Sequence, residues 1–359
     1  MQSAESEFFE AASVSEMVEG QNTLKASLFT LIVLAQDIDR THYCQQLVYL
    51  IAKKFPCKII FISLDTTAQQ GLFETTRMTR SVSGPGSICC DMLRVKLSMD
   101  QVAKIPFLVV SELISDLPAF LLVGHNPFEI ESVIHMLEPY VGRIVFDAMH
   151  LGNVGAFAQQ MLAAKTRDKY VDLNWARTKP WRESLSRVFQ SEERFAHLAF
   201  CGHLEIRYSR RAGKDHSADT QAVFLQAWFA SRLGWTLINI EQTEEQTKIL
   251  YRYDHHEIVV LLSPIDSDIM EEGNICAVEL RGQHDVHYLL NYEVDDRHIV
   301  VHSSSQDRCE MPYTLFVGSF QRGRTLPAEI FQQAISEHYL PMIELLSHSG
   351  WMFDRYLLH

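Results

Sequence analysis

The first half of this chain takes its fold from two apolar runs, ASLFTLIVLA at residues 26–35 and KIIFISL at residues 58–64. Continuous apolar runs of strand length are typical of strands that are buried on both faces of a sheet. The segment between them, 41–54, spaces its apolar residues along one face of a helix, and Asp39 or Thr41 can cap its start. The pattern therefore predicts a β-α-β unit whose two strands run parallel.

Strands and helices continue to alternate up to about residue 165. Three further strands are predicted, at Ser87–Leu97, Ala119–Val123 and Arg143–Asp147. Helices are predicted at Asp100–Val110, after the start signal Asn126-Pro127, and at Asn153–Lys165. This alternation indicates an α/β domain with a mostly parallel sheet.

The second half has a different pattern, in which short strands follow one another with turn residues between them. Residues 172–188 are expected to be helical after Pro180, residues 204–208 to form a strand and residues 220–233 a helix. The later strands are expected at residues 236–240, 248–253, 257–262, 274–280, 286–294 and 298–303. Short connections join antiparallel neighbours, and residues 326–357 are expected to close the chain as one or two helices.

These patterns predict an α/β N-terminal domain, with a mostly parallel sheet and helices, followed by an α+β domain with an antiparallel sheet and C-terminal helices. We place an acidic N-terminal tail at 1–22, the α/β domain at 23–165 and the α+β domain at 166–359. The tail is set apart because the first 20 residues hold five glutamates and no lysine or arginine. That composition is the opposite of the start of a signal peptide.

The overall composition is that of a globular protein that does not bind nucleic acid. Of the 359 residues, 32 are Lys or Arg and 45 are Asp or Glu, which gives a net charge of −13. Nucleic-acid-binding proteins usually show a clustered excess of basic residues. The apolar runs are shorter than the roughly 20 residues that span a bilayer, and the seven cysteines form no CxxC pair. We therefore expect a cytoplasmic protein with reduced thiols and with no nucleic-acid or membrane partner.

The turn after the first strand disfavours a dinucleotide site. Such a site needs a glycine-rich turn, so that backbone N–H groups can approach the phosphates. Residues 36–39 are Gln-Asp-Ile-Asp, with no glycine and two acidic side chains. The Gly-Pro-Gly sequence at residues 84–86 precedes a predicted strand instead of a helix. We therefore expect no cofactor.

The remaining residues give no catalytic or metal-binding set. His284 and His287 flank Asp285, and His255-His256 lies in a predicted turn, but neither group has a second ligand pair at zinc-site spacing. Solvated turn residues are the simpler interpretation. The chain has no GxSxG motif for a serine nucleophile, and Cys89-Cys90 begins a predicted strand, where at least one thiol packs as a small apolar group. We expect neither an enzyme nor a metal protein.

The most unusual segment is VDLNWARTKPWR at residues 171–182, which concentrates Trp and Arg in an acidic chain. Both residue types are enriched in the hot spots of protein–protein interfaces. The alternative is that Trp175 and Trp181 are core anchors at a domain junction and that Arg177 and Arg182 pair with local carboxylates. All four residues are candidates for a partner interface.

Three stretches follow one another along the chain: ICCDMLRVKL with ISDLPAFLLV within residues 88–123, DLNWARTKPWRESLSRV at 172–188, and DTQAVFLQAWFASRL at 219–233. The second has the form D-L-x-W-x-R-x-x-x-W-R and is the most specific. In motif, order and spacing, the three stretches resemble the glucose-6-phosphate dehydrogenase assembly protein family, called OpcA. The resemblance covers residues 24–359.

The resemblance implies a non-catalytic protein. It would bind the tetrameric glucose-6-phosphate dehydrogenase at the entry of the oxidative pentose phosphate pathway, and promote its assembly or activate it allosterically. Two alternatives stay open, which are an enzyme acting on sugar phosphates with Arg177 and Arg182 as phosphate ligands, and a metabolite sensor. The missing glycine-rich turn disfavours the enzyme. The isolated chain is therefore expected neither to oxidise glucose 6-phosphate nor to bind NADP.

Overall fold

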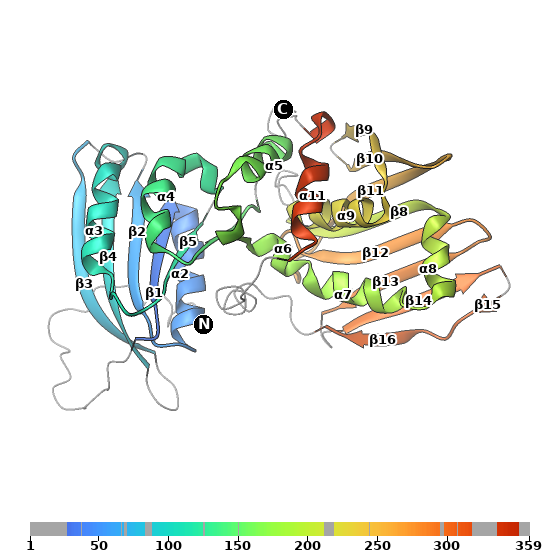
Figure 1. Cartoon of the computed structure of the whole chain (residues 1–359). Helices are drawn as coiled ribbons and strands as arrows, with labels where there is room; N and C mark the ends of the chain where they lie inside the picture. Colours follow the sequence, from blue (N-terminus) through green and yellow to red (C-terminus); the bar gives the residue numbers. More distant parts are fainter. Residues whose placement is uncertain are drawn as a thin grey trace. The chain divides into compact units, whose positions relative to one another are not determined.

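The computed structural model describes residues 27–36, 38–65, 67, 70–82, 88–124, 126–149, 151–211, 219–243, 245–294, 298–306, 308–317 and 336–351. They form two compact units. Of the described residues, the first unit holds those up to Asp147 together with 168–173, and the second unit holds the others. Each unit is built on one sheet, and Figure 1 labels most of the strands and helices. The domain ranges expected from the sequence stay a prediction.

The first unit is built on sheet A, whose strands lie in the order β3-β4-β2-β1-β5-β6-β7. The strands are β1 (Thr30–Gln36), β2 (Lys58–Asp65), β3 (Phe73–Val82), β4 (Ile88–Ser98), β5 (Ala119–Val123), β6 (Arg143–Phe146) and β7 (Tyr170–Asp172). Neighbours run parallel except β3 and β4, which form an antiparallel pair at one edge. Without β3, this is the strand order of a doubly wound fold whose order reverses between β1 and β5.

The helices of the first unit begin where the sequence provides start signals. They are α2 (Ile38–Ala52), α3 (Ile105–Glu112) and α4 (Glu131–Leu137), with the short 3₁₀ turns η1 (Met99–Lys104), η2 (Pro127–Ile130) and η3 (Glu138–Tyr140). The Asn126 side chain accepts a hydrogen bond from the Phe128 backbone N–H at 3.1 Å, and Pro127 occupies the first helical position. The predicted start signal is therefore confirmed, although its first turn is 3₁₀.

Burial explains why the central strands of sheet A are apolar throughout. Every residue of β5 and the first six residues of β1 are buried. Leu47, Val48 and Ile51 of α2 belong to one core cluster with the inward-facing residues of β1 and β2. The predicted β-α-β unit is confirmed, because β1 and β2 are parallel neighbours with α2 between them in the chain.

The second unit is built on sheet B, in the order β15-β14-β13-β12-β8-β11-β10-β9, with β16 paired to β14. The strands are β8 (Cys201–Arg210), β9 (Thr236–Gln242), β10 (Thr247–Tyr253), β11 (His256–Asp266), β12 (Ile275–Gly282), β13 (His287–Glu293), β14 (His298–Ser305), β15 (Arg308–Cys309) and β16 (Tyr313–Phe316). Neighbours are antiparallel, except that β8 and β11 are parallel. The fold class is therefore confirmed as α/β followed by α+β.

Helices cover one face of sheet B. The helices after β6 are α5 (Val154–Ala163), α6 (Leu173–Arg177), α7 (Lys179–Val188), α8 (Glu192–Ala199), α9 (Thr220–Leu233) and α11 (Tyr339–Leu346), with η6 (Ser349–Trp351). Figure 1 shows α8 and α9 on the same side of the sheet. The Tyr251 hydroxyl of β10 donates to Gln226 Oε1 of α9 at 2.7 Å, and the rings of Phe189 and Tyr288 meet at 4.8 Å. No described helix combines the length and the apolar content that crossing a membrane requires.

The structure adds elements that the sequence pattern does not predict. These are β3, β7, α8, β15 and β16. The ten-residue strand β3 has the sequence FETTRMTRSV, which is polar because the strand lies at the sheet edge and most of its described side chains are exposed. Of the predicted closing helices at 326–357, only residues 336–351 lie in the described part, where they form α11 and η6.

Candidate functional site

The 172–188 segment forms two short helices, α6 and α7, with Pro180 in the first turn of α7. Proline is tolerated there because the first N–H groups of a helix have no intrahelical partner. Trp181 of α7 is fully buried, and Trp175 of α6 is 6% exposed. The Trp175 ring lies 5.6 Å from the Tyr339 ring of α11, between centroids. Both indoles therefore belong to the packed interior, in agreement with the core-anchor interpretation.

Arg177 is buried as well, with only 4% of its surface exposed. Its Nη1 donates to Asn174 Oδ1, one turn earlier on α6, at 2.8 Å. A charged group is stable in a protein interior only where hydrogen bonds from the protein replace those from water. A substitution of Arg177 therefore acts first on the fold.

Arg182 is half-buried and stacks on Trp175, with its guanidinium carbon 3.4 Å from the ring centroid. Its Nε donates to Thr178 Oγ1 and its Nη2 to the Trp175 carbonyl, both at 3.1 Å. The Thr178 hydroxyl donates to the same carbonyl at 2.8 Å. Arg182 thus ties α7 to α6 through cation–π and hydrogen-bond contacts.

The four candidate interface residues lie in one segment, but largely below the surface. Trp175, Arg177 and Trp181 are buried, and Arg182 is the one of the four with an appreciable exposed part. Contact of these residues with a partner stays a prediction.

A second candidate region is the end of sheet A between β1 and β5, where doubly wound folds bind their ligands. β1 ends at Gln36 and α2 begins at Ile38, so a single residue connects them. A glycine-rich phosphate turn is longer, because several successive N–H groups must face the phosphates. Asp37 and the Asp39 side chain lie outside the described residues. A connection this short does not fit the pyrophosphate of a dinucleotide.

Protein groups fill the neighbouring strand ends. A Cβ on Gly124, which directly follows β5, would lie 2.5 Å from the Cys44 sulfur of α2. Glycine therefore allows α2 to approach the end of β5 closely. The Tyr43 hydroxyl, also on α2, donates to Asp147 Oδ2 just after β6, and Asp147 is only 2% exposed. These contacts hold α2 against the ends of β5 and β6.

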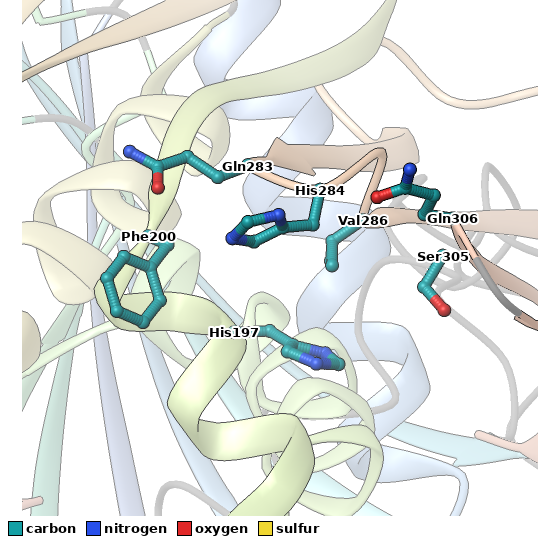
Figure 2. Close-up of a pocket in the computed structure, with 7 residues that line it drawn as sticks. All are labelled: His197, Phe200, Gln283, His284, Val286, Ser305 and Gln306. Carbon is teal, nitrogen blue, oxygen red and sulfur yellow. The ribbon is translucent and has the colours of Figure 1, made fainter.

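Of the two histidine turns, the β12–β13 turn lines a small pocket. Figure 2 shows His284 of the β12–β13 turn directed toward a pocket of about 200 Å³, with Phe200 and His197 at its sides. His287, two residues after Asp285, begins β13 instead, and its Nε2 lies 2.9 Å from Glu279 Oε1. His255, in the β10–β11 turn, has a side chain that is 91% exposed. The described residues contain no group of three or more His, Cys, Asp or Glu that would hold a metal ion.

The most concentrated set of charged contacts lies on sheet B, on the face opposite the helices. We call it the Glu279 cluster, and its members are Glu205 and Arg207 of β8, Glu279 and Arg281 of β12, and His287 of β13. Arg207 Nη2 lies 3.0 Å from Glu205 Oε2 and 2.6 Å from Glu279 Oε2. Arg281 Nε lies 2.8 Å from Glu279 Oε1. The cluster therefore joins three adjacent strands.

The cluster holds its carboxylates in the charged form. Burial alone would raise the pKa of Glu279, but hydrogen bonds from Arg281 and His287 outweigh it and lower that pKa. The pKa of Glu205 is lowered in the same way, with Arg207 opposing the effect of burial. Burial, followed by the charge of Arg281, lowers the pKa of the nearby His203. The carboxylates of Glu205 and Glu279 and the guanidinium groups that pair with them are therefore charged at neutral pH.

The sequence contains a signal for this cluster that is visible only once the strands are paired. Residues 205–207 are Glu-Ile-Arg and residues 279–281 are Glu-Leu-Arg. In a strand, the first and third residues of each triplet point to the same face. Two such triplets on antiparallel neighbours place two carboxylates among two guanidinium groups, as β8 and β12 do with Glu205 opposite Glu279.

Family models match most of the chain. The model described as the N-terminal domain of the glucose-6-phosphate dehydrogenase subunit matches residues 49–163. The model described as the C-terminal domain of the same protein matches residues 168–315. The second match includes the 172–188 segment, the whole of β8–β14 and the Glu279 cluster.

Curated relatives and solved structures give two further likenesses. OxPP cycle protein OpcA of Synechocystis sp. is 23% identical over 193 residues, which are 53% of this chain and 39% of that protein. OxPP cycle protein OpcA of Nostoc punctiforme is 22% identical over 198 residues, 54% of this chain and 41% of that protein. The matched region thus spans about two fifths of these relatives.

The fold is similar to that of oxidoreductases. The 3-ketoreductase KijD10 of Actinomadura kijaniata, solved with TDP-benzene and NADP, has a TM-score of 0.52 at 10% identity, covering 89% of this chain and 95% of that chain. An oxidoreductase of Thermotoga maritima has a TM-score of 0.50 at 8% identity, covering 91% and 96%. At such low identity the likeness concerns the fold alone. The NADP of KijD10 has no matching turn here, because the β1–α2 connection is a single residue.

Proposed function

The chain belongs to the OpcA family, and from that premise we propose that it binds glucose-6-phosphate dehydrogenase as a non-catalytic assembly factor and allosteric activator. The observation that supports this most directly is the match of both family models, at residues 49–163 and 168–315. The proposed setting is the oxidative pentose phosphate pathway in the cytoplasm, and the curated relatives are named for the OxPP cycle.

The end of sheet A supports a non-catalytic role. A hydride-transfer enzyme on this fold would hold its dinucleotide at the switch point of the sheet. Here the connection after β1 is one residue long, and the Tyr43–Asp147 contact and the approach of Cys44 to Gly124 fill the neighbouring strand ends. The chain is therefore expected to act through its surface on the dehydrogenase.

The alternative of a sugar-phosphate enzyme or sensor has less support. It would use the guanidinium groups of Arg177 and Arg182 as anion ligands. Arg177 is 4% exposed, and Arg182 directs two of its nitrogens at Thr178 and Trp175. Neither group presents an open fork to a ligand in solution.

The test is a mixing experiment with the full chain and its cognate dehydrogenase. Size-exclusion chromatography with light scattering should show co-elution at a mass above that of either protein. Dehydrogenase rates at saturating glucose 6-phosphate and NADP should rise when the chain is added, whereas the chain alone should give no rate. Separate elution together with an unchanged rate would reject the proposal. Calorimetric binding of micromolar NADP to the chain alone would reject its non-catalytic part.

A further inference from the structure

Among the described residues, sheet B has one face that helices cover and one that they do not. Residues that pair across the strands share a face, so the pairings define the uncovered side. Val259 lies opposite His203 and Leu250, and Val300 lies opposite Asn291 and Thr314. We call this side the open face; Glu205, Arg207, Val259, Glu279, Leu289 and Val300 mark its extent from β11 to β14.

The alternation of burial along the strands separates the two faces. On β8, the residues that face the helices, Leu204 and Ile206, are fully buried, whereas His203, Glu205 and Arg207 keep exposed parts. On β11, Val260 and Leu262 are fully buried, whereas Val259 and Leu261 keep exposed parts. The open face thus leaves aliphatic side chains in contact with solvent. Surface of this kind is typical of a sheet that packs on another molecule.

The centre of the open face is fixed before any partner arrives. Glu279 has a side chain only 5% exposed, yet it points away from the helices, because Arg207, Arg281 and His287 close around it. Arg281 covers the carboxylate and stays 60% exposed. Side chains that are already ordered lose little conformational freedom on binding, which favours affinity. The cluster therefore presents guanidinium edges outward and keeps its carboxylates beneath them.

This arrangement argues against a second copy of the chain as the occupant. In a two-fold pairing of open faces with its axis through the Glu279 cluster, the guanidinium groups of Arg207 and Arg281 would approach the same groups of the other copy. A surface with carboxylates at matching positions would instead add ion pairs. The favoured occupant is therefore a different protein with a flat, acidic patch.

The open face from β11 to β14 is five strands wide. With strands about 4.8 Å apart and roughly 18 Å long, it covers on the order of 400 Å². A partner would bury a similar area, so the total of roughly 800 Å² from these five strands has the size of a transient contact. Leu250 of β10 and Thr314 of β16 extend the same side of the sheet beyond them.

We propose that the open face of sheet B is the surface on which the dehydrogenase docks, through a flat patch of the dehydrogenase that carries carboxylates toward Arg207 and Arg281. The inference rests on the proposed function and adds to it the surface and the chemistry of the contact. It assigns the contact to the region that matches the C-terminal-domain model, and to residues other than those of the 172–188 segment.

The experiment replaces one valine at a time by aspartate in the full chain, and Val259 and Val300 are both partly exposed. Val259→Asp and Val300→Asp place a carboxylate on either side of the Glu279 cluster, where a docked acidic patch would repel it. Val110→Asp, on α3 of the first unit and 40% exposed, is the matched control. Binding to the cognate dehydrogenase is measured by biolayer interferometry, and each variant's Tm is recorded to confirm folding.

We expect Val259→Asp and Val300→Asp to weaken the complex by about thirtyfold or more at an unchanged Tm, because a desolvated like-charge contact is strongly unfavourable. Val110→Asp should bind like the wild type. If the wild type does not bind, the proposed function itself fails, and this inference with it. If the wild type and both open-face variants bind equally well, only the open-face proposal fails.

Two further measurements test whether the open face pairs with a second copy of the chain and guard against unstable variants. Sedimentation of the chain alone should show a species that is the same for the wild type and for Val259→Asp. A self-associated wild type that Val259→Asp dissociates would overturn the proposal in favour of a second copy. If either aspartate variant lowers the Tm, Val259→Lys and Val300→Lys replace it, and these should bind at least as tightly as the wild type.

Discussion

Sheet A and sheet B use their strands in opposite ways. The strands β1 and β5 of sheet A are buried almost throughout, and their sequences are continuous apolar runs. The strands β8 and β11 of sheet B alternate buried and half-exposed residues. Among the described residues, the central strands of sheet A are buried on both faces, whereas the central strands of sheet B keep one face partly exposed, which is the face proposed to dock.

The comparison also separates a family motif from the proposed docking surface. The motif at 172–188 is the most specific sequence likeness, yet its Trp175, Arg177 and Trp181 are buried. The open face has no comparable motif, only the two Glu-x-Arg triplets. The most recognisable residues of this chain are thus those that build the second unit, and we expect substitutions of them to act through stability.

The largest effect is expected from Trp181→Ala. The indole is fully buried, so its removal leaves a cavity and should lower the free energy of unfolding by about 3–5 kcal/mol. Urea denaturation followed by far-UV circular dichroism measures the loss, and Trp181→Phe should lose less. Dehydrogenase binding per folded molecule should not change. A Trp181→Ala variant that is as stable as the wild type but does not bind the dehydrogenase would instead support a role of Trp181 in the partner interface.

Gly124→Ala should destabilise the first unit by about 1–3 kcal/mol, the range for overpacking a core. The new methyl group would lie 2.5 Å from the Cys44 sulfur. The double variant Gly124→Ala/Cys44→Ala should recover part of the loss. Gly142→Ala is the control, since its nearest neighbour is the Ala119 carbonyl oxygen at 3.9 Å. Equal stability of Gly124→Ala and Gly142→Ala would contradict the close packing at the end of β5.

Much of the fold could be predicted from sequence because burial on both faces leaves a plain signal. The runs at β1, β2 and β5 are apolar throughout, and their predicted positions are confirmed with small shifts at the ends. β7 has three residues and no recognisable pattern, and only its pairing with β6 defines it. The parallel pairing of β8 with β11 joins residues far apart in the sequence, so the apolar periodicity within each strand does not predict it.

The candidate site was harder to predict, because Trp and Arg are common both in interfaces and in buried networks. The sequence shows that Trp175, Arg177, Trp181 and Arg182 lie in one segment. It does not show that the first three are buried, because their burial depends on how the segment packs in the folded unit. The Glu279 cluster depends on the register between β8 and β12, which a single sequence does not contain.

A smaller loss is expected from Arg182→Ala, which removes the guanidinium group stacked on Trp175 at 3.4 Å. For a half-buried cation–π contact the loss in unfolding free energy is about 1–2 kcal/mol. Thermal denaturation measures this loss. The stability of Arg182→Lys should fall between those of the wild type and Arg182→Ala, because lysine keeps the charge but not the planar contact. If Arg182→Ala leaves the Tm unchanged and yet lowers dehydrogenase activation, the residue acts at the interface.

The smallest effect is a pH dependence of the second unit. Burial, and then the charge of Arg281, lowers the pKa of His203 below its ordinary value of 6.5, so the unfolded chain binds the proton more readily. The associated stability is complete above pH 6.5 and is lost as the pH falls below it. Urea midpoints between pH 7.5 and 5.5 should therefore fall more steeply for the wild type than for His203→Gln. Parallel curves would contradict this.

The path of the chain through β7 has a consequence for how the protein is made. β7 completes the edge of sheet A beside β6, but the residues between them, 148–167, belong to the second unit. No uninterrupted piece of sequence therefore contains the whole of sheet A without part of the other unit. A fragment ending at Ala163 would leave the backbone of Ile144–Phe146 as an unprotected edge, open to pairing with other chains. During synthesis, sheet A stays incomplete until the ribosome has passed Asp172, by which time α5 of the other unit has already been synthesised.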